Sequence, residues 1–303
     1  MTSLPAHATI GVGRLGLVAH GREPNRKSPI EGAMARWVTG RCNANGIELS
    51  YLRTGGDKPP VVLLHGLTAD GACWTPLARA LENDYDVVMP DARGHGRSGT
   101  PADGYRYDDL AADVVGLMDA LGVTAPVLLG HSMGGMTAAV VASRNPRRLQ
   151  GLILVDPTFL TPQRQREVYE SDAAELHRRT LGRRKEDLVA ELRRRHERRS
   201  PEILDLIAHA RLRTDVRAFD VLTPPNPDHR QLIEGLALPT LLVVGDVGSV
   251  VSRELAAELA RLNPRLKVEP IVDAGHGIPY DQPEHLAAVV RAFLGTLRGA
   301  ALR

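Results

Sequence analysis

Residues 127–135 read Val-Leu-Leu-Gly-His-Ser-Met-Gly-Gly, an apolar run that ends in Gly-x-Ser-x-Gly, and an alanine-rich apolar segment follows at once. This order is typical of a nucleophile elbow, in which a strand turns sharply into a helix and exposes a serine hydroxyl. Gly130 and Gly134 suit such a turn because a Cβ at either position would collide with the neighbouring strand or helix. The stretch therefore predicts that Ser132 lies at the end of a strand in a strained backbone conformation.

The segments around the elbow alternate between strand and helix. Continuous apolar runs predict strands that are buried on both faces, and apolar residues on one stripe predict helices. The strands are expected at residues 47–51, 61–64, 85–89, 126–129, 151–155, 239–244 and 267–272. The helices are expected at residues 74–81, 107–121, 135–144, 253–262 and 284–297. This alternation predicts an α/β fold with a mostly parallel, doubly wound sheet of about eight strands.

The alternation stops at Pro157, and this break predicts the domain organisation. Residues 159–235 have helical patterns, are dense in Arg and Glu, and contain no good strand. They are expected to form a helical cap inserted into a core made of residues 37–158 and 236–303. Such an insertion would lie over the carboxyl ends of the strands, where α/β sheets bind ligands. Residues 1–36 show no helical or strand period and are expected to form a flexible N-terminal arm.

Composition and charge argue against several classes of protein. The apolar fraction of 43% and the charged fraction of 24% are ordinary for a globular protein. No apolar run has the length of a membrane span, and the first residues lack the order of a secretory signal. A net charge of +2 gives no general case for binding nucleic acid or a membrane surface. Cys42 and Cys73 have no metal or redox spacing, so a cytoplasmic location without a metal or other cofactor is expected.

Four motifs together resemble the α/β-hydrolase superfamily over about residues 40–300. They are Leu-His-Gly-Leu at 64–67, Asp-Ala-Arg-Gly-His-Gly-Arg-Ser at 91–98, the elbow at 130–134 and Ala-Gly-His at 274–276. Each motif alone is a weak signal. Their occurrence in the family's order, with the expected strands between them, is a strong one.

The resemblance implies a set of catalytic groups. Ser132 would be the nucleophile, and His276, in a glycine-flanked loop after the last strand, would be its general base. The backbone N–H groups of Leu67 and Met133 would form the oxyanion hole. The substrate implied is a small molecule with an acyl group, and the protein would act as a monomer or a homodimer.

The carboxylate that should orient His276 is left open by the sequence. Many relatives place it three residues beyond the position of Gly245, where this chain has Gly248. Asp156, at the end of the preceding strand, is favoured, because some lactone and amidomethylene-succinate hydrolases carry the acid there. Asp246, one residue past Gly245, is the alternative. Both choices keep the order Ser, Asp, His along the chain.

The sequence offers two kinds of evidence about the substrate. The residues expected to line a pocket are His65, which is also expected to support its loop, Trp74, Phe159, Leu160, Tyr169 and Phe219. The many arginines of residues 159–235 would suit an anionic substrate or a solvated helix face with interleaved glutamates. The solvated face is favoured because charged runs rarely point inward.

The function predicted is that of a serine hydrolase that cleaves a carboxylic ester, a lactone or an activated amide through an acyl-enzyme. The alternatives on the same scaffold are a C–C bond hydrolase, a lyase, a cofactor-free perhydrolase and a non-catalytic ligand-binding receptor. Epoxide and haloalkane hydrolases are disfavoured because they need a carboxylate in the place of Ser132.

Overall fold

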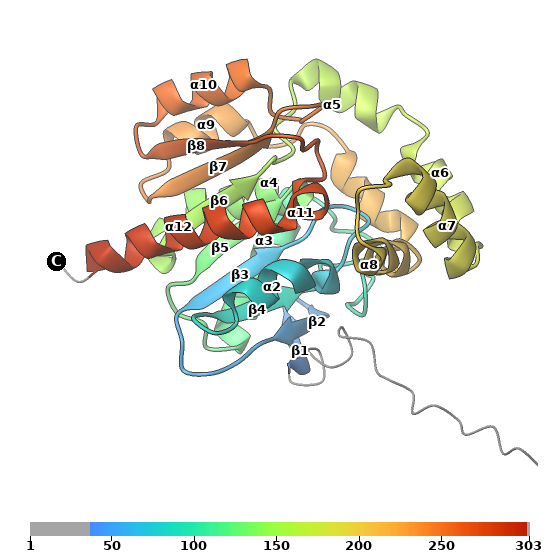
Figure 1. The fold of residues 1–303 in the computed structure, drawn as a ribbon, viewed down its shortest axis with the longest axis horizontal. Helices are drawn as coiled ribbons and strands as arrows, with labels where there is room; N and C mark the ends of the chain where they lie inside the picture. The colour runs from blue at the N-terminus through green and yellow to red at the C-terminus, as the bar shows by residue number, and fades with distance from the viewer. Residues whose placement is uncertain (1–36, 302–303) are drawn as a thin grey trace, which may run out of the picture.

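The computed structural model describes residues 37–301, in which eight strands form one sheet in the order β1-β2-β4-β3-β5-β6-β7-β8 (Figure 1). β1 and β2 are antiparallel to their neighbours, and every pairing from β4 to β8 is parallel. This confirms the predicted mostly parallel α/β sheet. The predicted arm, residues 1–36, lies outside the described residues. The strands are β1 Val38–Ala44, β2 Ile47–Arg53, β3 Pro60–Leu64, β4 Asp86–Pro90, β5 Val127–His131, β6 Gly151–Val155, β7 Thr240–Gly245 and β8 Leu266–Ile271.

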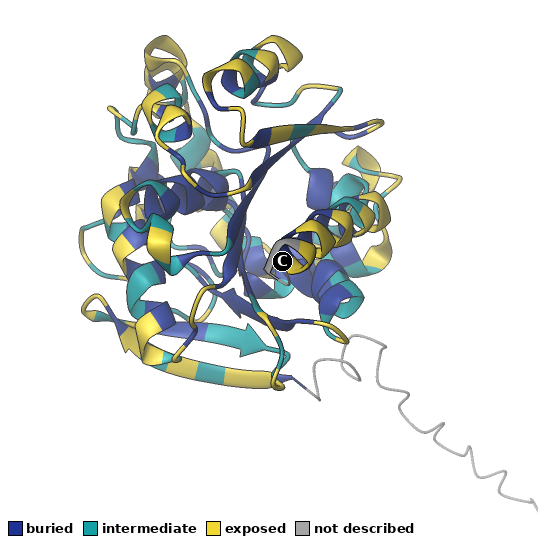
Figure 2. Ribbon diagram, turned by 90° about the vertical axis from the view of Figure 1, so that its left-hand side faces the viewer, coloured by how far each residue is buried: buried dark blue, intermediate teal, exposed yellow. Residues whose placement is uncertain are grey.

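Helices cover both faces of the sheet, and successive strand residues pack against opposite layers. On one face, Leu129 belongs to a cluster with α2 and α12, which lie in front of the sheet in Figure 1. On the other face, Leu128 belongs to a cluster with α3, α4, α9 and α10. Figure 2 shows the central strands as a buried layer between these helices. The helices are α2 Thr75–Leu81, α3 Tyr107–Ala120, α4 Met133–Arg144, α9 His229–Glu234, α10 Arg253–Leu262 and α12 Pro283–Ala301, with the short α11 Ile278–Asp281 before the last.

Most of the chain between β6 and β7 is helical. It forms α5 Pro162–Tyr169, α6 Ala173–Leu181, α7 Lys185–Arg195, α8 Pro201–Arg211 and the 3-10 helix η3 Val216–Leu222, followed by α9. The helices α6, α7 and α8 lie together at one end of the sheet (Figure 1). Two other 3-10 helices are η1 Gly71–Trp74 and η2 Pro146–Arg148. No helix within residues 37–301 is long and apolar enough to cross a membrane.

The segment α6–α8 is held by its own small core and by the loop that follows β3. Leu192 of α7 and Ile207 of α8 belong to one apolar cluster. Leu206 and Ala210 of α8 pack against Ala69, a residue of the loop after β3. These contacts place α8 over the carboxyl end of β3, next to the neighbouring end of β5 where the elbow begins.

Candidate functional site

The elbow has a backbone geometry that requires glycine at positions 130 and 134. Ser132 joins β5 to α4 with φ 54° and ψ −118°, a backbone conformation that residues other than glycine rarely adopt. Its backbone N–H donates to the carbonyl oxygen of Val155 at 3.1 Å, which ties the turn to β6. A Cβ at Gly130 would overlap the carbonyl oxygen of Gly134, and a Cβ at Gly134 would overlap that of Leu64. The strained turn therefore depends on both glycines.

The loop after β8 brings His276 to Ser132. The imidazole Nε2 lies 2.9 Å from Ser132 Oγ, and Nδ1 lies 2.6 Å from Asp156 Oδ2. The carbonyl oxygen of His276 accepts a hydrogen bond of 2.7 Å from Nε2 of His131, whose ring lies 4.9 Å from that of His276. Burial, reinforced by the nearby His276, lowers the pKa of His131 to about 3. His131 is therefore a neutral donor that fixes the backbone of His276.

Asp156 lies at the end of β6, fully buried and with φ 39°. Its carboxylate accepts hydrogen bonds of 2.9 Å from the backbone N–H groups of Val250 and Val251 in addition to the contact with His276. These two N–H groups come from the loop after β7, which passes through Gly248 with φ 65°. The resemblance drew attention to this loop as a place for the acid; here it supplies donors that hold the carboxylate of Asp156.

Asp246 has a different partner. Its backbone N–H donates to the carbonyl oxygen of Ala274 at 3.0 Å, and its Oδ1 accepts from the N–H of Ala274 at 3.3 Å. Asp246 therefore connects the loop after β7 to the loop that carries His276. Of the two carboxylates suggested by the sequence, the structure brings Asp156 to the imidazole and Asp246 to a neighbouring backbone.

The two expected oxyanion donors lie beside Ser132. Met133 is the first residue of α4, and the first N–H groups of a helix have no intrahelical acceptor. Leu67 lies in a tight turn closed by a 3.1 Å hydrogen bond from the N–H of Ala69 to the carbonyl oxygen of Gly66. That turn runs against the serine, since a Cβ at Gly66 would lie 3.1 Å from Ser132 Cβ. Neither N–H donates to another backbone group of the described chain.

A cavity of about 260 Å³ opens above Ser132. The core contributes its floor through Ser132, His131, His276–Gly277, Tyr280 and the loop 66–69. The opposite side comes from the helical segment between β6 and β7, here called the cap for short. It contributes His196 after α7, Arg199 before α8, and Ile207 and Arg211 in α8.

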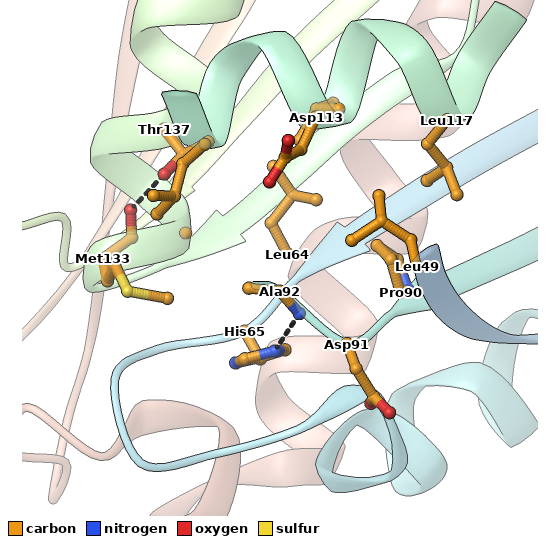
Figure 3. A pocket seen from close by; sticks show the side chains of 13 residues that line it. Leu49, Leu64, His65, Pro90, Asp91, Ala92, Asp113, Leu117, Met133 and Thr137 are labelled. Atoms are coloured by element: carbon orange, nitrogen blue, oxygen red, sulfur yellow. Dashed lines mark hydrogen bonds between the residues drawn. The ribbon is translucent and has the colours of Figure 1, made fainter. Parts of the chain in front are cut away.

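Two of the residues predicted to line the substrate pocket are buried in the core instead. Trp74, only 3% exposed, packs into the apolar layer beneath α2. His65 does not line the cavity of Ser132: its Nε2 accepts from the N–H of Ala92 at 2.9 Å (Figure 3), and its Nδ1 lies 2.9 Å from the carbonyl oxygen of Gly66. His65 thus ties the loop after β3 to the loop after β4, which agrees with its expected support of that loop.

The four other residues predicted to line this pocket also lie elsewhere. Phe159 stacks on His229, with ring centroids 5.1 Å apart, and Leu160 lines a separate hollow near α10. Tyr169, at the end of α5, is 53% exposed. Phe219 comes nearest, because it lines an adjoining cavity that shares Thr68 and Arg211 with the cavity of Ser132. Their apolar character therefore did not identify which cavity they line, and Tyr169 is not buried at all.

A second, smaller cavity of about 30 Å³ lies behind the elbow (Figure 3). Its walls are mainly apolar side chains of the core, and Thr137, which closes one side, donates to the carbonyl oxygen of Met133 at 2.9 Å. This volume holds about one water molecule. The cavity is a packing defect of the core, away from the serine hydroxyl.

The sequence analysis missed several residues of the cavity. His196, Arg211 and Tyr280 lie in segments without a recognisable motif, and helical periodicity indicates a buried face without identifying what it covers. Arg199 was one of many arginines in the insertion, with no feature to distinguish it. Within residues 37–301, no three His, Cys, Asp or Glu side chains are arranged to hold a metal ion.

Comparison with known proteins gives consistent results. A family profile for the alpha/beta hydrolase fold matches residues 59–283. N-formylmaleamate deformylase of Pseudomonas putida is 32% identical over 260 residues, which cover 84% of this chain and 96% of the relative. The solved structure of an N-formylmaleamic acid deformylase from Pseudomonas putida superposes with a TM-score of 0.72 at 27% identity, covering 84% of this chain and all of that one. The enol-lactonase of Burkholderia xenovorans gives a TM-score of 0.70 at 26% identity with the same coverage.

Proposed function

The chain belongs to the α/β-hydrolase fold family and is a hydrolase, and on this premise we propose that it is a serine hydrolase of carboxylic esters, lactones or activated amides. One observation carries the proposal. Ser132 Oγ, the imidazole of His276 and the carboxylate of Asp156 form a continuous chain of hydrogen bonds, 2.9 Å and 2.6 Å long. A nucleophile, a base within reach of its proton and a third group that orients the base are the recurring parts of this chemistry.

In the proposed reaction, Ser132 Oγ attacks the carbonyl carbon of the substrate and its proton passes to Nε2 of His276. The tetrahedral intermediate collapses, the bond to the leaving alcohol or amine breaks, and the imidazolium returns the proton to the leaving group. Water then attacks the acyl-enzyme with His276 again acting as base. The acid product leaves and Ser132 regains its proton.

The N–H groups of Leu67 and Met133 are proposed to bind the oxyanion. Both are backbone donors on rigid segments, so they need no reorganisation when charge develops on the carbonyl oxygen. Loss of one such donor typically costs about 3 kcal/mol of transition-state stabilisation.

Asp156 is proposed to orient the imidazole and to stabilise its protonated form. Its carboxylate is fixed by the N–H groups of Val250 and Val251, so that Oδ2 faces Nδ1 of His276. With Nδ1 carrying a proton, Nε2 is left as the acceptor toward Ser132, which is the tautomer a general base requires. The two backbone donors keep the carboxylate in place through the catalytic cycle.

The relatives support acyl transfer to water as the reaction class. A deformylase removes a formyl group and an enol-lactonase opens a lactone, as their names state. Both reactions pass through attack on a carbonyl carbon. We therefore include activated amides beside esters and lactones in the proposal.

The experiment that tests the proposal compares the protein with its Ser132→Ala variant on p-nitrophenyl acetate, a small enol lactone and an N-formyl imide. We expect turnover of at least one of the three and a fall in kcat of at least about 10⁴-fold in the variant. Ser171→Ala, which removes an exposed hydroxyl after α5, is the matched control and should be unchanged. Equal rates in the protein and in Ser132→Ala would refute the proposal, and binding without turnover would favour a receptor.

A further inference from the structure

Seven of the fifteen arginines in residues 159–235 form ion pairs with carboxylates at most eight positions away in the sequence. Arg178 and Arg184 each form an exposed ion pair with an acidic residue three positions away. Arg183 and Arg195 both contact Glu191. Such pairs point to solvent and need no ligand. For these residues the structure agrees with the favoured interpretation of a solvated helix face.

Two other arginines line the cavity of Ser132 instead. Arg199 is largely buried and forms an ion pair with Asp281, with Nε 2.8 Å from Oδ1. Arg211, the last residue of α8, is half-buried. Within the described residues, its guanidinium group has no carboxylate at ion-pair distance and no hydrogen-bond acceptor. The pKa of Arg211 is lowered, mainly by burial. Arg211 is nevertheless a cation, because a guanidinium group stays protonated at neutral pH.

The charges around the cavity have one sign. Its lining includes two arginines, and no Asp or Glu among the described residues; of its three histidines, His131 is neutral. The adjoining cavity that shares Thr68 and Arg211 contains one acid, Glu191, which is already engaged by two other arginines. A buried cation without a partner is unfavourable, so an anion that enters the cavity would supply the missing partner of Arg211.

The geometry of the cation and the size of the cavity limit what this anion can be. A guanidinium group presents paired N–H donors that match the two oxygens of a carboxylate. The cavity has a volume of about 260 Å³, and the adjoining cavity, which shares Thr68 and Arg211 with it, has a volume of about 460 Å³. The part that Ser132 and Arg211 both line is large enough for a small organic acid.

We propose that the substrate is a small acyl compound with a carboxylate, which Arg211 binds while the reacting carbonyl group lies at Ser132. The inference rests on the proposed hydrolase function, since it names the substrate class of the same site. Arg199, already paired with Asp281, adds positive potential beside the carboxylate. The carboxylate thus directs the acyl group from the roof of the cavity toward the elbow on its floor.

Binding of succinate tests the carboxylate site without any turnover. Titration calorimetry is performed on Ser132→Ala and on the double variants that add Arg211→Gln, Arg211→Lys or Arg184→Gln. We expect Ser132→Ala to bind succinate, Arg211→Gln to weaken binding on the order of 10- to 100-fold, and Arg211→Lys to restore part of it. Arg184→Gln, the matched control on an exposed pair, should change nothing. Absence of binding, or equal binding with Arg211→Gln, would overturn the inference.

A matched pair of esters tests the same claim during turnover. The protein should prefer mono-p-nitrophenyl succinate to p-nitrophenyl butyrate in kcat/KM, and Arg211→Gln should lower this ratio on the order of 10- to 100-fold. An unchanged ratio with active enzyme would overturn the inference and leave the hydrolase function intact. Arg211-dependent binding of succinate without turnover of any ester or amide would have the opposite meaning: the carboxylate site at Arg211 would stand, and the hydrolase function would fall together with the substrate class inferred from it.

Discussion

The two halves of the cavity at Ser132 are built in different ways. On the core side, Ser132, His276 and Asp156 follow strands β5, β8 and β6, and backbone hydrogen bonds fix their positions. On the cap side, Arg199 lies just before α8 and Arg211 at its end, and this helix packs through small apolar clusters. Backbone hydrogen bonds therefore fix the groups at the strand ends, whereas side chains of a separately packed helical segment form the other side of the cavity.

The largest expected effect concerns the core half and tests which carboxylate, Asp156 or Asp246, acts on His276. Asp156→Asn should lower kcat by about 10⁴-fold, because the amide favours the wrong imidazole tautomer and leaves the imidazolium without its counter-charge. Asp246→Asn is the matched control and should stay within about threefold, since Asp246 bonds to Ala274 and not to His276. Steady-state kinetics on the best ester or amide decides the matter. A larger loss in Asp246→Asn would contradict the assignment.

The next effect concerns how tightly the core half is packed. Gly130→Ala should lower the free energy of unfolding by about 3 kcal/mol or more, because its Cβ would overlap backbone atoms that cannot move aside. Gly295→Ala makes the same chemical change at an exposed position of α12 with open space around it, and should raise stability by up to about 1 kcal/mol. Urea denaturation measures both. Similar values for the two variants would show that the elbow is more compliant than described.

The core half should also determine how stability depends on pH. Burial lowers the pKa of His95, near His65, and of His131 to about 3, so both stay neutral in the folded protein and take up a proton only on unfolding. The contribution of such groups to the free energy of unfolding is fully present above about pH 6.5, the pKa of histidine in the unfolded chain. It is lost as the pH falls below this value, because the unfolded chain then takes up protons that the folded protein does not. Asp70 acts oppositely, because burial raises its pKa to about 6, and it offsets part of the loss between about pH 6 and pH 4.

Measured by urea denaturation, the free energy of unfolding should fall between pH 7 and pH 5. His95→Asn should reduce this fall by about 2 kcal/mol, the contribution of one histidine with these two pKa values. The difference between the two pH values is the readout, so a general destabilisation by the variant does not affect it. An equal fall in the protein and the variant would mean that His95 takes up a proton in the folded state.

The smallest effects distinguish ion pairs inside the cap from the pair that joins it to the core. Arg199→Met should lower the free energy of unfolding by about 1–2 kcal/mol, because its pair with Asp281 is largely shielded from water. Arg184→Met should change it by less than about 0.5 kcal/mol, since the side chain is 78% exposed. Thermal unfolding of both variants tests the difference. Equal changes in the two variants would show that the pair joining the cap to the core contributes no more than a pair inside the cap.

The core half was more predictable from the sequence than the cap half, for physical reasons. A parallel strand buried on both faces is a continuous apolar run, so β3, β5, β6 and β7 are plain in the sequence. Antiparallel β1, Val38–Ala44, was not predicted, because its residues are mostly exposed and include Gly, Arg and Asn. Ser132 Oγ and His276 Nε2 lie 2.9 Å apart, and the four motifs in the family's order led us to expect this contact.

Where the sequence left alternatives, the missing information was three-dimensional. The contact of Asp156 with His276 depends on how the loop at Gly248 directs two N–H groups, which no motif records. The pocket residues were chosen for their apolar character, but Phe159 and Trp74 use it to fill the core. Arg211 is distinguished by lining the cavity without a carboxylate partner among the described residues, and this can be seen only when the helices are packed.

Covalent labelling tests most directly the claim that Ser132 is an activated nucleophile. The folded protein is treated with a fluorophosphonate, and the adduct is located by peptide mass spectrometry in the protein and in Ser132→Ala, His276→Ala and Asp156→Asn. The account predicts one adduct, on Ser132, that is absent from Ser132→Ala and forms far more slowly when His276 or Asp156 is changed. An unlabelled Ser132 in the folded protein, or a labelling rate that does not depend on His276, would contradict it.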